Sequence, residues 1–267
     1  MTRVSVIIPA WGEAPLLERA CASVRAQTFS DVELVVAAPP SDAPQTLPAA
    51  RLAGLAKAAG EWIAFCDADD WIEPNAIEEM LKAAARESAD CVCCGMCRDG
   101  VDGKSVFRPF DRAGPSDTYN ALVNKLFRRE LLANLMIDTS ITLGEDLMVT
   151  AQAMAKAKKI AVLDKAFYHY CENPGSVTHV QDGRKRVEEL ARVGEILREA
   201  MPNPESADFH DRVTRDALLL WIRYRLFDRA LWRMLRTRMK GGLLADSRHG
   251  LLKKGALGCA ACLFDRP

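Results

Sequence analysis

The sequence predicts an α/β protein: a mixed, mostly parallel sheet flanked by helices, followed by a helical C-terminal extension. Short apolar runs at residues 4–8, 33–37 and 61–66 have the length and composition of buried strands. Helical patterns separate these runs, and connections this short favour parallel strands joined by right-handed crossovers. After residue 182 the patterns are charged and helical. We therefore expect a sheet domain at residues 1–182 and a helical extension at residues 183–267.

Composition limits the class of protein. The chain has 267 residues, of which 49% are hydrophobic, and its 36 basic residues equal its 36 acidic ones. The balanced charge gives no general reason to expect nucleic-acid binding. The sequence begins without a charged leader, and no window reaches the apolar length that spans a bilayer. Nine cysteines without a secretory signal indicate free thiols in a reducing compartment, so we expect a cytoplasmic protein.

The elements follow in order from local patterns. The strand at residues 4–8 is closed by Pro9, and a helix is expected from about Pro15, which suits a first helical position. Residues 38–48 are rich in Pro, Ser and Asp and predict a loop, after which a short helix is expected over residues 52–59. Another helix should begin at Pro74. The apolar stripes of the first and last of these helices are Leu16, Leu17, Ala20, Cys21 and Val24, and Ile77, Met80, Leu81 and Ala84, respectively.

The third strand ends in Asp67-Ala68-Asp69-Asp70, which places three carboxylates within four residues. Gathered carboxylates repel one another and resist burial, so they need a counter-cation. An Asp-x-Asp pair at such an edge can bind a hard divalent ion, which can in turn hold a diphosphate. Ligands of open α/β sheets bind beyond the carboxyl ends of the strands, which groups residues 9–13, 37–40 and 67–70 around one crevice. The alternative is a solvated loop whose acids cap the next helix.

Several short segments of the sequence form an ordered set. These are Val4 to Trp11, Ser23 to Phe29, Ala50 to Gly54, Gly60 to Asp70, Asn124 to Leu132, Gly144-Glu145-Asp146, Tyr168-His169-Tyr170 and Gly175-Ser176-Val177-Thr178. In this ordered set the sequence resembles a known family, glycosyltransferase family 2, whose fold is called GT-A. The resemblance covers roughly residues 3–180.

The resemblance implies roles for individual residues. Asp67 and Asp69 match the family's DxD motif, which holds Mn²⁺ or Mg²⁺ on the diphosphate of the donor, and Asp70 would be a neighbour that caps a helix. The first loop of the nucleotide pocket corresponds to Pro9, Ala10 and Glu13, and an arginine near the nucleotide corresponds to Arg51. The general base corresponds to Asp146 and a contact to the acceptor to Glu145. His169 could reach the metal or the phosphates, although a hydrogen-bonded structural histidine is the favoured interpretation.

The activity implied by this resemblance is metal-dependent, inverting transfer of a sugar from a nucleotide-diphosphate donor, most plausibly a UDP-sugar, to a glycan or lipid-linked acceptor. Such an enzyme would serve in cell-surface polysaccharide synthesis. A cation and Arg51 would stabilise the departing charge, while one carboxylate would take the proton of the attacking hydroxyl. Asp146 has an alternative role, because acids in a first helical turn are favoured by the helix dipole alone.

Two departures from the family pattern concern the nucleotide base. The family has an acidic pair after the second strand, where this chain has Ala37-Ala38-Pro39-Pro40-Ser41-Asp42, and alanine and proline side chains cannot accept a hydrogen bond. Asp42 could substitute if the loop folds back. The connection is also short and leaves no room for the usual extra helix and strand. A catalytically impaired domain that binds a sugar, a nucleotide or a partner protein is therefore the alternative to an enzyme.

Two further patterns allow more than one interpretation. The cysteines between Cys91 and Cys97 are dense enough for a metal site, but they fall on a predicted buried strand, which favours a place in the core. Residues 208–240 form a basic helical pattern with interleaved tryptophans. This helix could contact an anionic membrane surface, at the inner face of the membrane, or pack as a helical cap on the catalytic domain.

Overall fold

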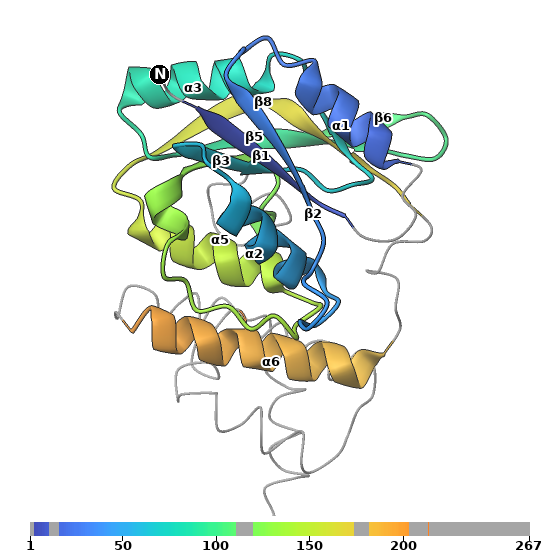
Figure 1. Ribbon diagram of the computed structural model, residues 1–267, viewed down its shortest axis with the longest axis vertical. Helices are drawn as coiled ribbons and strands as arrows, with labels where there is room; N and C mark the ends of the chain where they lie inside the picture. The colour runs from blue at the N-terminus through green and yellow to red at the C-terminus, as the bar shows by residue number, and fades with distance from the viewer. Residues whose placement is uncertain (1–2, 11–15, 111–119, 174–181, 203–212, 214–267) are drawn as a thin grey trace, which may run out of the picture. The chain divides into compact units, whose positions relative to one another are not determined.

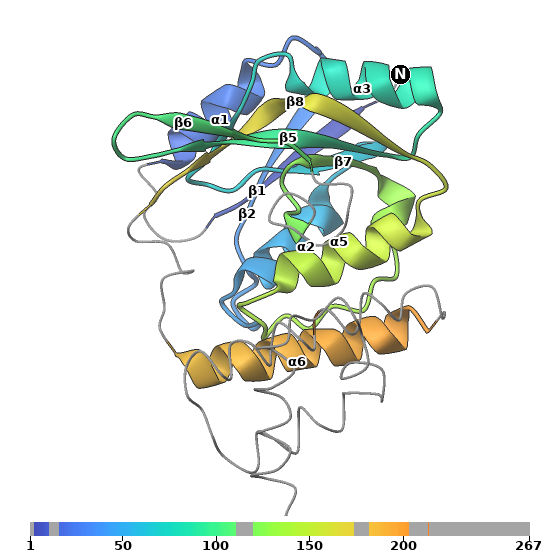
Figure 2. The same cartoon turned by 180° about the vertical axis from the view of Figure 1, so that it is seen from behind.

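The computed structural model describes residues 3–10, 16–110, 120–173, 182–202 and 213. It divides into two compact units, Met1–His179 and Val180–Pro267. The first unit is a single sheet with helices on both faces: α1 and α3 cover one face, and α2 and α5 cover the other (Figures 1 and 2). Within the described residues of the second unit lies the helix α6. The basic pattern at 208–240 falls almost entirely outside the described residues.

The sheet has eight strands in the order β2-β1-β3-β7-β5-β8-β4, with β6 paired to β5. The strands are β1 (Val4–Pro9), β2 (Val32–Ala37), β3 (Trp62–Phe65), β4 (Trp71–Ile72), β5 (Cys91–Asp99), β6 (Ser105–Arg108), β7 (Lys125–Arg128) and β8 (Ile160–Cys171). The helices are α1 (Leu17–Arg25), α2 (Leu47–Lys57), α3 (Ala76–Glu87), α5 (Glu145–Lys156) and α6 (Gly183–Ala200), with a 3₁₀ turn η1 (Arg129–Leu132).

The sheet is mixed, as predicted, and its two longest pairings, β1 with β2 and β5 with β8, are parallel. β1 pairs in parallel with β2 and β3, and β5 pairs in parallel with β8. The other pairings among the described strands, β3 with β7, β4 with β8, and β5 with β6 and β7, are antiparallel. The parallel part agrees with the predicted strand–helix–strand units. The antiparallel part involves β4, β6 and β7, which are short strands of two to four residues whose local pattern does not set their direction.

The central strands of the sheet are formed by segments whose side chains are buried. All six residues of β1 and all four of β3 are buried, which matches their uninterrupted apolar sequence. Cys91, Cys93 and Cys94 of β5 are also buried and belong to the same hydrophobic core. Free cysteine behaves as a small apolar residue in such a position. The cysteine-rich segment therefore forms the middle of a core strand.

Helix boundaries differ from the predicted ones in two places. α2 begins at Leu47, five residues earlier than expected, because Pro48 fits the first turn of a helix and continues it into the Ala-rich segment. α1 begins at Leu17, and Leu16 is 37% exposed, so Leu16 does not belong to the buried stripe. In α3 the buried positions include Ala83, whereas Leu81 is only partly buried.

The connection between β2 and β3 is as short as the sequence implies. It consists of a loop and the single helix α2, and β2 lies at the edge of the sheet. The carboxyl ends of the three parallel strands meet, since Ala10 donates its N–H to the Ala37 carbonyl at 2.9 Å and Cys66 donates to the Ile7 carbonyl at 3.0 Å. This edge of the sheet carries the predicted site.

The second unit is described here by its helix alone. α6 begins after Asp182, whose side chain accepts the Lys185 N–H at 3.1 Å and so caps the helix. Arg184 and Glu188 form an exposed ion pair one turn apart. No helix in the described part of the chain is both long and apolar enough to cross a membrane.

Candidate active site

The carboxylates after β3 lie in a tight turn. The Asp70 N–H donates to the Asp67 carbonyl at 3.1 Å and closes this turn. The Asp67 side chain is 27% exposed, so it lies at the boundary between the core and the solvent. The buried strand β3 thus delivers Asp67 and Asp69 to the edge where the parallel strands end.

Arg51 joins three predicted site residues from two other elements. It projects from α2 with only 6% of its side chain exposed, and its Nη2 lies 2.9 Å from Asp67 Oδ1. Its Nη1 forms an ion pair with Asp146 Oδ1 and lies 3.7 Å from Glu145 Oε1. A buried guanidinium needs such partners, because an unpaired charge in the interior is strongly unfavourable. The structure therefore brings Arg51, Asp67, Glu145 and Asp146 into one cluster.

The start of α5 places the acidic pair of this cluster. Gly144 precedes the helix with φ of 83°, a conformation that glycine adopts without steric strain, and Glu145 and Asp146 occupy the first turn. The Asp146 side chain does not cap its own helix. Its Oδ2 accepts the Leu122 N–H at 3.2 Å, while Oδ1 contacts Arg51. Asp146 is thus held from two other segments, in the direction of Asp67.

Burial and like charges dominate the electrostatics of the cluster. Burial and the neighbouring Asp146 carboxylate raise the pKa of Glu145 to about 8. Burial also raises the pKa of Asp67, although the Arg51 charge opposes this. The pKa of Arg51 is raised, because the attraction of Asp146, Asp67 and Glu145 exceeds the effect of its burial. One guanidinium faces three carboxyl groups, so the cluster still favours an additional cation.

The remaining carboxylate of the motif, Asp69, is held from both sides of the turn. Its Oδ2 accepts a hydrogen bond from Asn173 Nδ2 at 3.1 Å, and its carbonyl accepts one from Arg19 Nη2 at 2.5 Å. Neither Arg19 nor Asn173 was identified from the sequence, because no motif or spacing links them to residues 67–70. Both are brought to the turn only by the packing of α1 and the end of β8.

The chemistry of Asp67 and Asp69 fits a divalent cation. Carboxylate oxygens are the ligands that Mn²⁺ and Mg²⁺ prefer, and the contacts named above use one oxygen of each side chain. In the described part of the chain no three His, Cys, Asp or Glu side chains form a group that could hold a metal ion. Two carboxylates would therefore bind the ion together with oxygens from a substrate, which is a common mode for Mg²⁺ sites.

Asp70 is not a helix cap, contrary to expectation. The residue that precedes α3 is Asn75, and the Asp70 side chain is instead buried, with 1% of the residue exposed. Its Oδ2 accepts a hydrogen bond from the Tyr168 hydroxyl, and its Oδ1 accepts the Cys171 N–H at 2.8 Å. Burial and the nearby Asp67 raise its pKa to about 8. Asp70 therefore links the turn to β8 rather than to the following helix.

His169 takes a structural position. Its Nδ1 lies 2.9 Å from Asp99 Oδ2 and its Nε2 lies 3.0 Å from Glu73 Oε1. The ring also stacks on Trp71, with 3.6 Å between the ring centroids. Both ring nitrogens are therefore bound by carboxylates that do not belong to Asp67 or Asp69. This agrees with the favoured interpretation of His169 as a hydrogen-bonded structural histidine, and not with the alternative of a metal ligand.

The end of β2 is where the family pattern predicts an acid that contacts the nucleotide base. Pro9 and Ala10 lie beside Ala37 at the ends of β1 and β2, whereas Glu13 lies outside the described residues. Asp42 is exposed in the loop that follows β2. Ala37 is buried, and its side chain offers no acceptor. The structure thus brings Pro9 and Ala10 to the edge where the parallel strands end.

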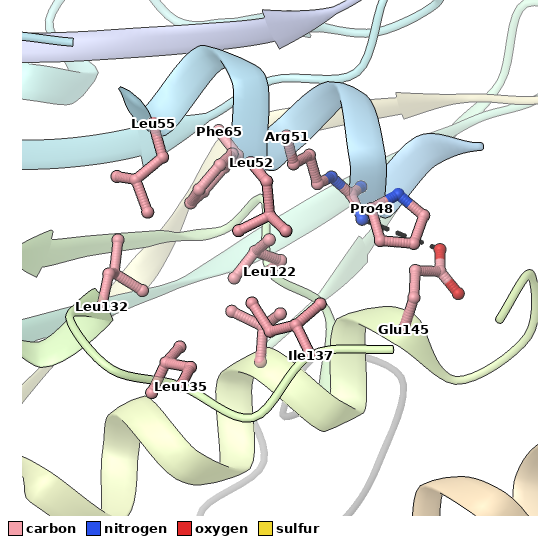
Figure 3. Close-up of a pocket in the computed structure, with 11 residues that line it drawn as sticks. Pro48, Arg51, Leu52, Leu55, Phe65, Leu122, Leu132, Leu135, Ile137 and Glu145 are labelled. Carbon is pink, nitrogen blue, oxygen red and sulfur yellow. Dashed lines mark ion pairs between the residues drawn. The ribbon is translucent and has the colours of Figure 1, made fainter. Parts of the chain in front are cut away.

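A small apolar pocket lies behind the charged cluster (Figure 3). Arg51 and Glu145 form one side, and the remaining lining residues are Pro48, Leu52, Leu55, Phe65, Leu122, Leu132, Leu135, Ile137 and Val149. Its volume is about 20 Å³, which leaves room for about one water molecule and none for a sugar ring. These side chains shield the inner side of the ion pairs from water, which strengthens their attraction.

Comparisons with known proteins agree with the sequence motifs. The family model described as glycosyl transferase family 2 matches residues 40–142. The chain is 26% identical to the uncharacterized glycosyltransferase EpsJ of Bacillus subtilis and 30% identical to the succinoglycan biosynthesis protein ExoO of Rhizobium meliloti, in each case over 66% of this chain. The match spans 63% of the length of each of these curated relatives.

Solved structures show the same fold. The TarS 1–349 fragment of Staphylococcus aureus in complex with UDP-GlcNAc has a TM-score of 0.61 and 18% identity. The mannosyltransferase PcManGT of Pyrobaculum calidifontis with GDP-Man and Mn²⁺ has a TM-score of 0.51 and 17% identity. Each similarity covers 98% of this chain and 80% of the other chain. Together with the ordered motifs, these matches identify a GT-A fold, and residues 40–142 carry the sequence pattern of glycosyltransferase family 2.

Proposed function

We propose that this protein is a metal-dependent, inverting glycosyltransferase that moves a sugar from a nucleotide-diphosphate donor to a hydroxyl acceptor in cell-surface glycan synthesis. One observation carries the proposal: Arg51 binds both Asp67, at the end of β3, and Asp146, at the start of α5. A residue suited to the cation on the donor's diphosphate and a residue suited to the acceptor's hydroxyl are thereby held on the same arginine. Catalysis of a transfer reaction requires such a fixed relation between the two groups that hold the reactants.

The donor side would consist of Asp67, Asp69 and Arg51. Asp67 and Asp69 would hold the cation, which when bound neutralises the diphosphate as it leaves. Arg51 supplies a fixed positive charge that needs no reorganisation during the reaction, because its partners already orient it. Pro9, Ala10 and Glu13 would line the nucleotide pocket. A UDP-sugar is the proposed donor, supported by the UDP-GlcNAc bound to TarS.

The acceptor side would consist of Asp146 and Glu145. Asp146 would take the proton of the acceptor hydroxyl while the oxygen attacks the anomeric carbon, and the bond from that carbon to the diphosphate breaks. Only one carboxylate acts as base and no side chain attacks the sugar, so a single displacement inverts the anomeric configuration. Glu145, whose pKa is raised to about 8, would present a neutral carboxyl group that can donate a hydrogen bond to the acceptor.

The names of relatives support the biological setting. ExoO is a succinoglycan biosynthesis protein, and TarS is a poly(ribitol-phosphate) β-N-acetylglucosaminyltransferase of Staphylococcus aureus. The acceptor of this chain would accordingly be a glycan or a lipid-linked saccharide. The enzyme would be cytoplasmic, and the basic residues of its extension would contact the inner face of the membrane.

A second candidate function follows from the end of β2. Ala37 and Ala38 replace the acids that would read the base, so a domain that binds a sugar, a nucleotide or a partner protein without transfer is the alternative. Calorimetric titration of UDP and GDP, with and without Mn²⁺, separates the two. Metal-dependent binding that disappears in Asp69→Ala supports the enzyme. No binding of either nucleotide would favour the non-catalytic domain.

A further inference from the structure

The turn after β3 is attached to the end of β8 by several side chains. Asp69 is bound by Asn173, and Asp70 is bound by the Tyr168 hydroxyl and by the Cys171 N–H. The Asp67 N–H also donates to the Tyr168 hydroxyl, at 3.2 Å. The two acids suited to a metal thus belong to a turn whose conformation is set from a strand far away in the sequence.

Tyr168 is the centre of this attachment. Its hydroxyl accepts from the first residue of the turn, Asp67, and donates to the last, Asp70, so one oxygen spans the turn. The residue is 1% exposed. Its backbone is fixed between two strands, opposite Ile72 of β4 and Met96 of β5. A buried ring held in this way gives the hydroxyl a fixed position.

We propose that Tyr168 is a positioning residue for the metal and donor site: its hydroxyl bridges Asp67 and Asp70 and thereby sets the direction of the Asp67 and Asp69 carboxylates. The inference rests on the proposed function, because it assigns Tyr168 to the support of that site. Residues that orient metal ligands commonly affect metal affinity about 10–100-fold when they are changed, without touching the metal themselves.

The hydroxyl rather than the ring makes this contribution. A phenylalanine at this position would keep the packing against β4 and β5 and would leave the Asp67 N–H and one oxygen of Asp70 buried without a partner. Buried polar groups seek new partners or water, so the turn would relax. Because Asp67 and Asp69 lie within this turn, their carboxylates would lose the geometry that suits a common ion.

The test is the Tyr168→Phe variant of the full chain, with Mn²⁺ affinity in the presence of UDP measured by the electron paramagnetic resonance signal of free Mn²⁺. We expect the dissociation constant for Mn²⁺ to rise about tenfold. With saturating Mn²⁺, kcat should fall less than the affinity does. Equal Mn²⁺ affinity in Tyr168→Phe and the unmodified chain would overturn the role of Tyr168 alone. Absence of Mn²⁺-dependent binding in the unmodified chain would overturn the proposed function together with this inference.

Two controls separate positioning from general stability. Tyr170→Phe removes a hydroxyl from the same strand, where the ring lies under the Arg98 guanidinium, and should leave Mn²⁺ affinity unchanged. Ala83→Gly weakens the buried helix α3 and should lower the melting temperature without changing Mn²⁺ affinity. A tenfold loss of Mn²⁺ affinity in Ala83→Gly as well would show that Tyr168 acts only through stability.

A second measurement needs neither metal nor activity. Amide hydrogen exchange should rise in the peptide that contains residues 66–70 when Tyr168 is changed to Phe, while exchange in β1 stays the same. If Tyr168→Phe does not fold, Asp70→Asn keeps the side-chain volume and can accept from Tyr168 or Cys171 but not from both. It should raise exchange in the same peptide. Unchanged exchange there, in whichever variant folds, would contradict the proposal.

Discussion

Asp67 and Asp146 bind two different terminal nitrogens of the same arginine, Arg51. This relationship connects the end of a central strand with the first turn of a helix that follows much later in the chain. A shared buried cation fixes the distance between two carboxylates that would otherwise repel each other. It also means that a change at any one of the three residues alters the electrostatic surroundings of the other two.

The first prediction concerns the proposed base. Asp146→Asn cannot take a proton, and we expect kcat for sugar transfer to fall about 10²–10⁴-fold. The affinity for UDP with Mn²⁺ should stay within a few-fold, because the proposed ligands of the cation that holds the diphosphate are Asp67 and Asp69. Transfer assays and calorimetry on the same preparation test both parts. Full transfer activity in Asp146→Asn would remove this residue from the role of base.

The second prediction concerns the counter-charge. Arg51→Met leaves Asp67, Glu145 and Asp146 close together without a cation, and removal of one partner from a buried ion pair lowers stability by about 3–5 kcal/mol. Urea unfolding at pH 7 should detect this loss. The loss should be smaller at pH 5, because burial raises the pKa of Asp67 and a lower pH favours its neutral carboxyl group once Arg51 is gone.

The matched control for this prediction is Arg51→Lys. Lysine keeps the charge but cannot place two nitrogens in a fixed fork, so an intermediate loss of stability is expected. Equal stability of Arg51→Met and the unmodified chain would show that the cluster contributes no net attraction to the fold.

The third prediction is a dependence of stability on pH. The pKa of Asp70 is about 8 in the folded protein against an ordinary value of 3.8, because of burial and the neighbouring Asp67. Between these values the folded state binds more protons than the unfolded state. The stabilisation that Asp70 contributes to the folded state is therefore complete below about pH 4 and is lost as the pH rises through 8. The free energy of unfolding falls by at most about 1.4 kcal/mol per pH unit for this one group.

Comparison with Asp70→Asn isolates this contribution from other groups. Glu33, for example, has a lowered pKa because it accepts a hydrogen bond from Ser5, and it acts in the opposite direction near pH 4. Urea unfolding between pH 5.5 and 8 should therefore show a steeper loss of stability in the unmodified chain than in Asp70→Asn. Parallel curves for the two proteins would contradict the assignment.

The fourth prediction concerns the packing of α2 on the sheet. A Cβ added at Gly54 would overlap Ile7 Cγ2 and would lie 3.3 Å from the Ala37 Cβ. We expect Gly54→Ala to lower the free energy of unfolding by about 1–3 kcal/mol through overpacking, although alanine is the better helix former. Arg51 lies one turn away on the same helix, so donor binding should weaken as well.

The control is Ala56→Gly, at an exposed position of the same helix, which changes helix propensity alone. It should lower the free energy of unfolding by about 1 kcal/mol. If Gly54→Ala instead stabilises the chain by a similar amount, α2 has room to move away from β1, and the close contact is not required.

Much of this architecture could be predicted from local sequence. The apolar runs of β1 and β3 give buried strands because a fully enclosed strand has no polar face, and short connections made them parallel. The antiparallel arrangement of β7 was not predicted, because a short strand pattern carries no information about its direction or neighbour. The start of α2 was placed too late, because a loop rich in proline also contains the proline of a first helical turn.

The candidate site, too, was predicted from local sequence only in part. Chain order and motif spacing identified Asp67, Asp69, Arg51 and Asp146 as individual candidates. They did not identify Tyr168, Asn173 or Arg19 as supports of the turn, since such contacts depend on which strands become neighbours. They also suggested that Asp70 caps a helix, which its contacts to β8 exclude.

The sequence by itself determined the strands, the residue types at their carboxyl ends and the family resemblance, because periodicity and motif order are local properties of the chain. Only the tertiary structure decided that one buried guanidinium binds acids from two distant segments, and that a hydroxyl from β8 spans the acidic turn. The physical reason is that charges and hydrogen-bonding groups must find partners once they are buried. Which partners are available depends on the sheet order, and local patterns do not encode that order.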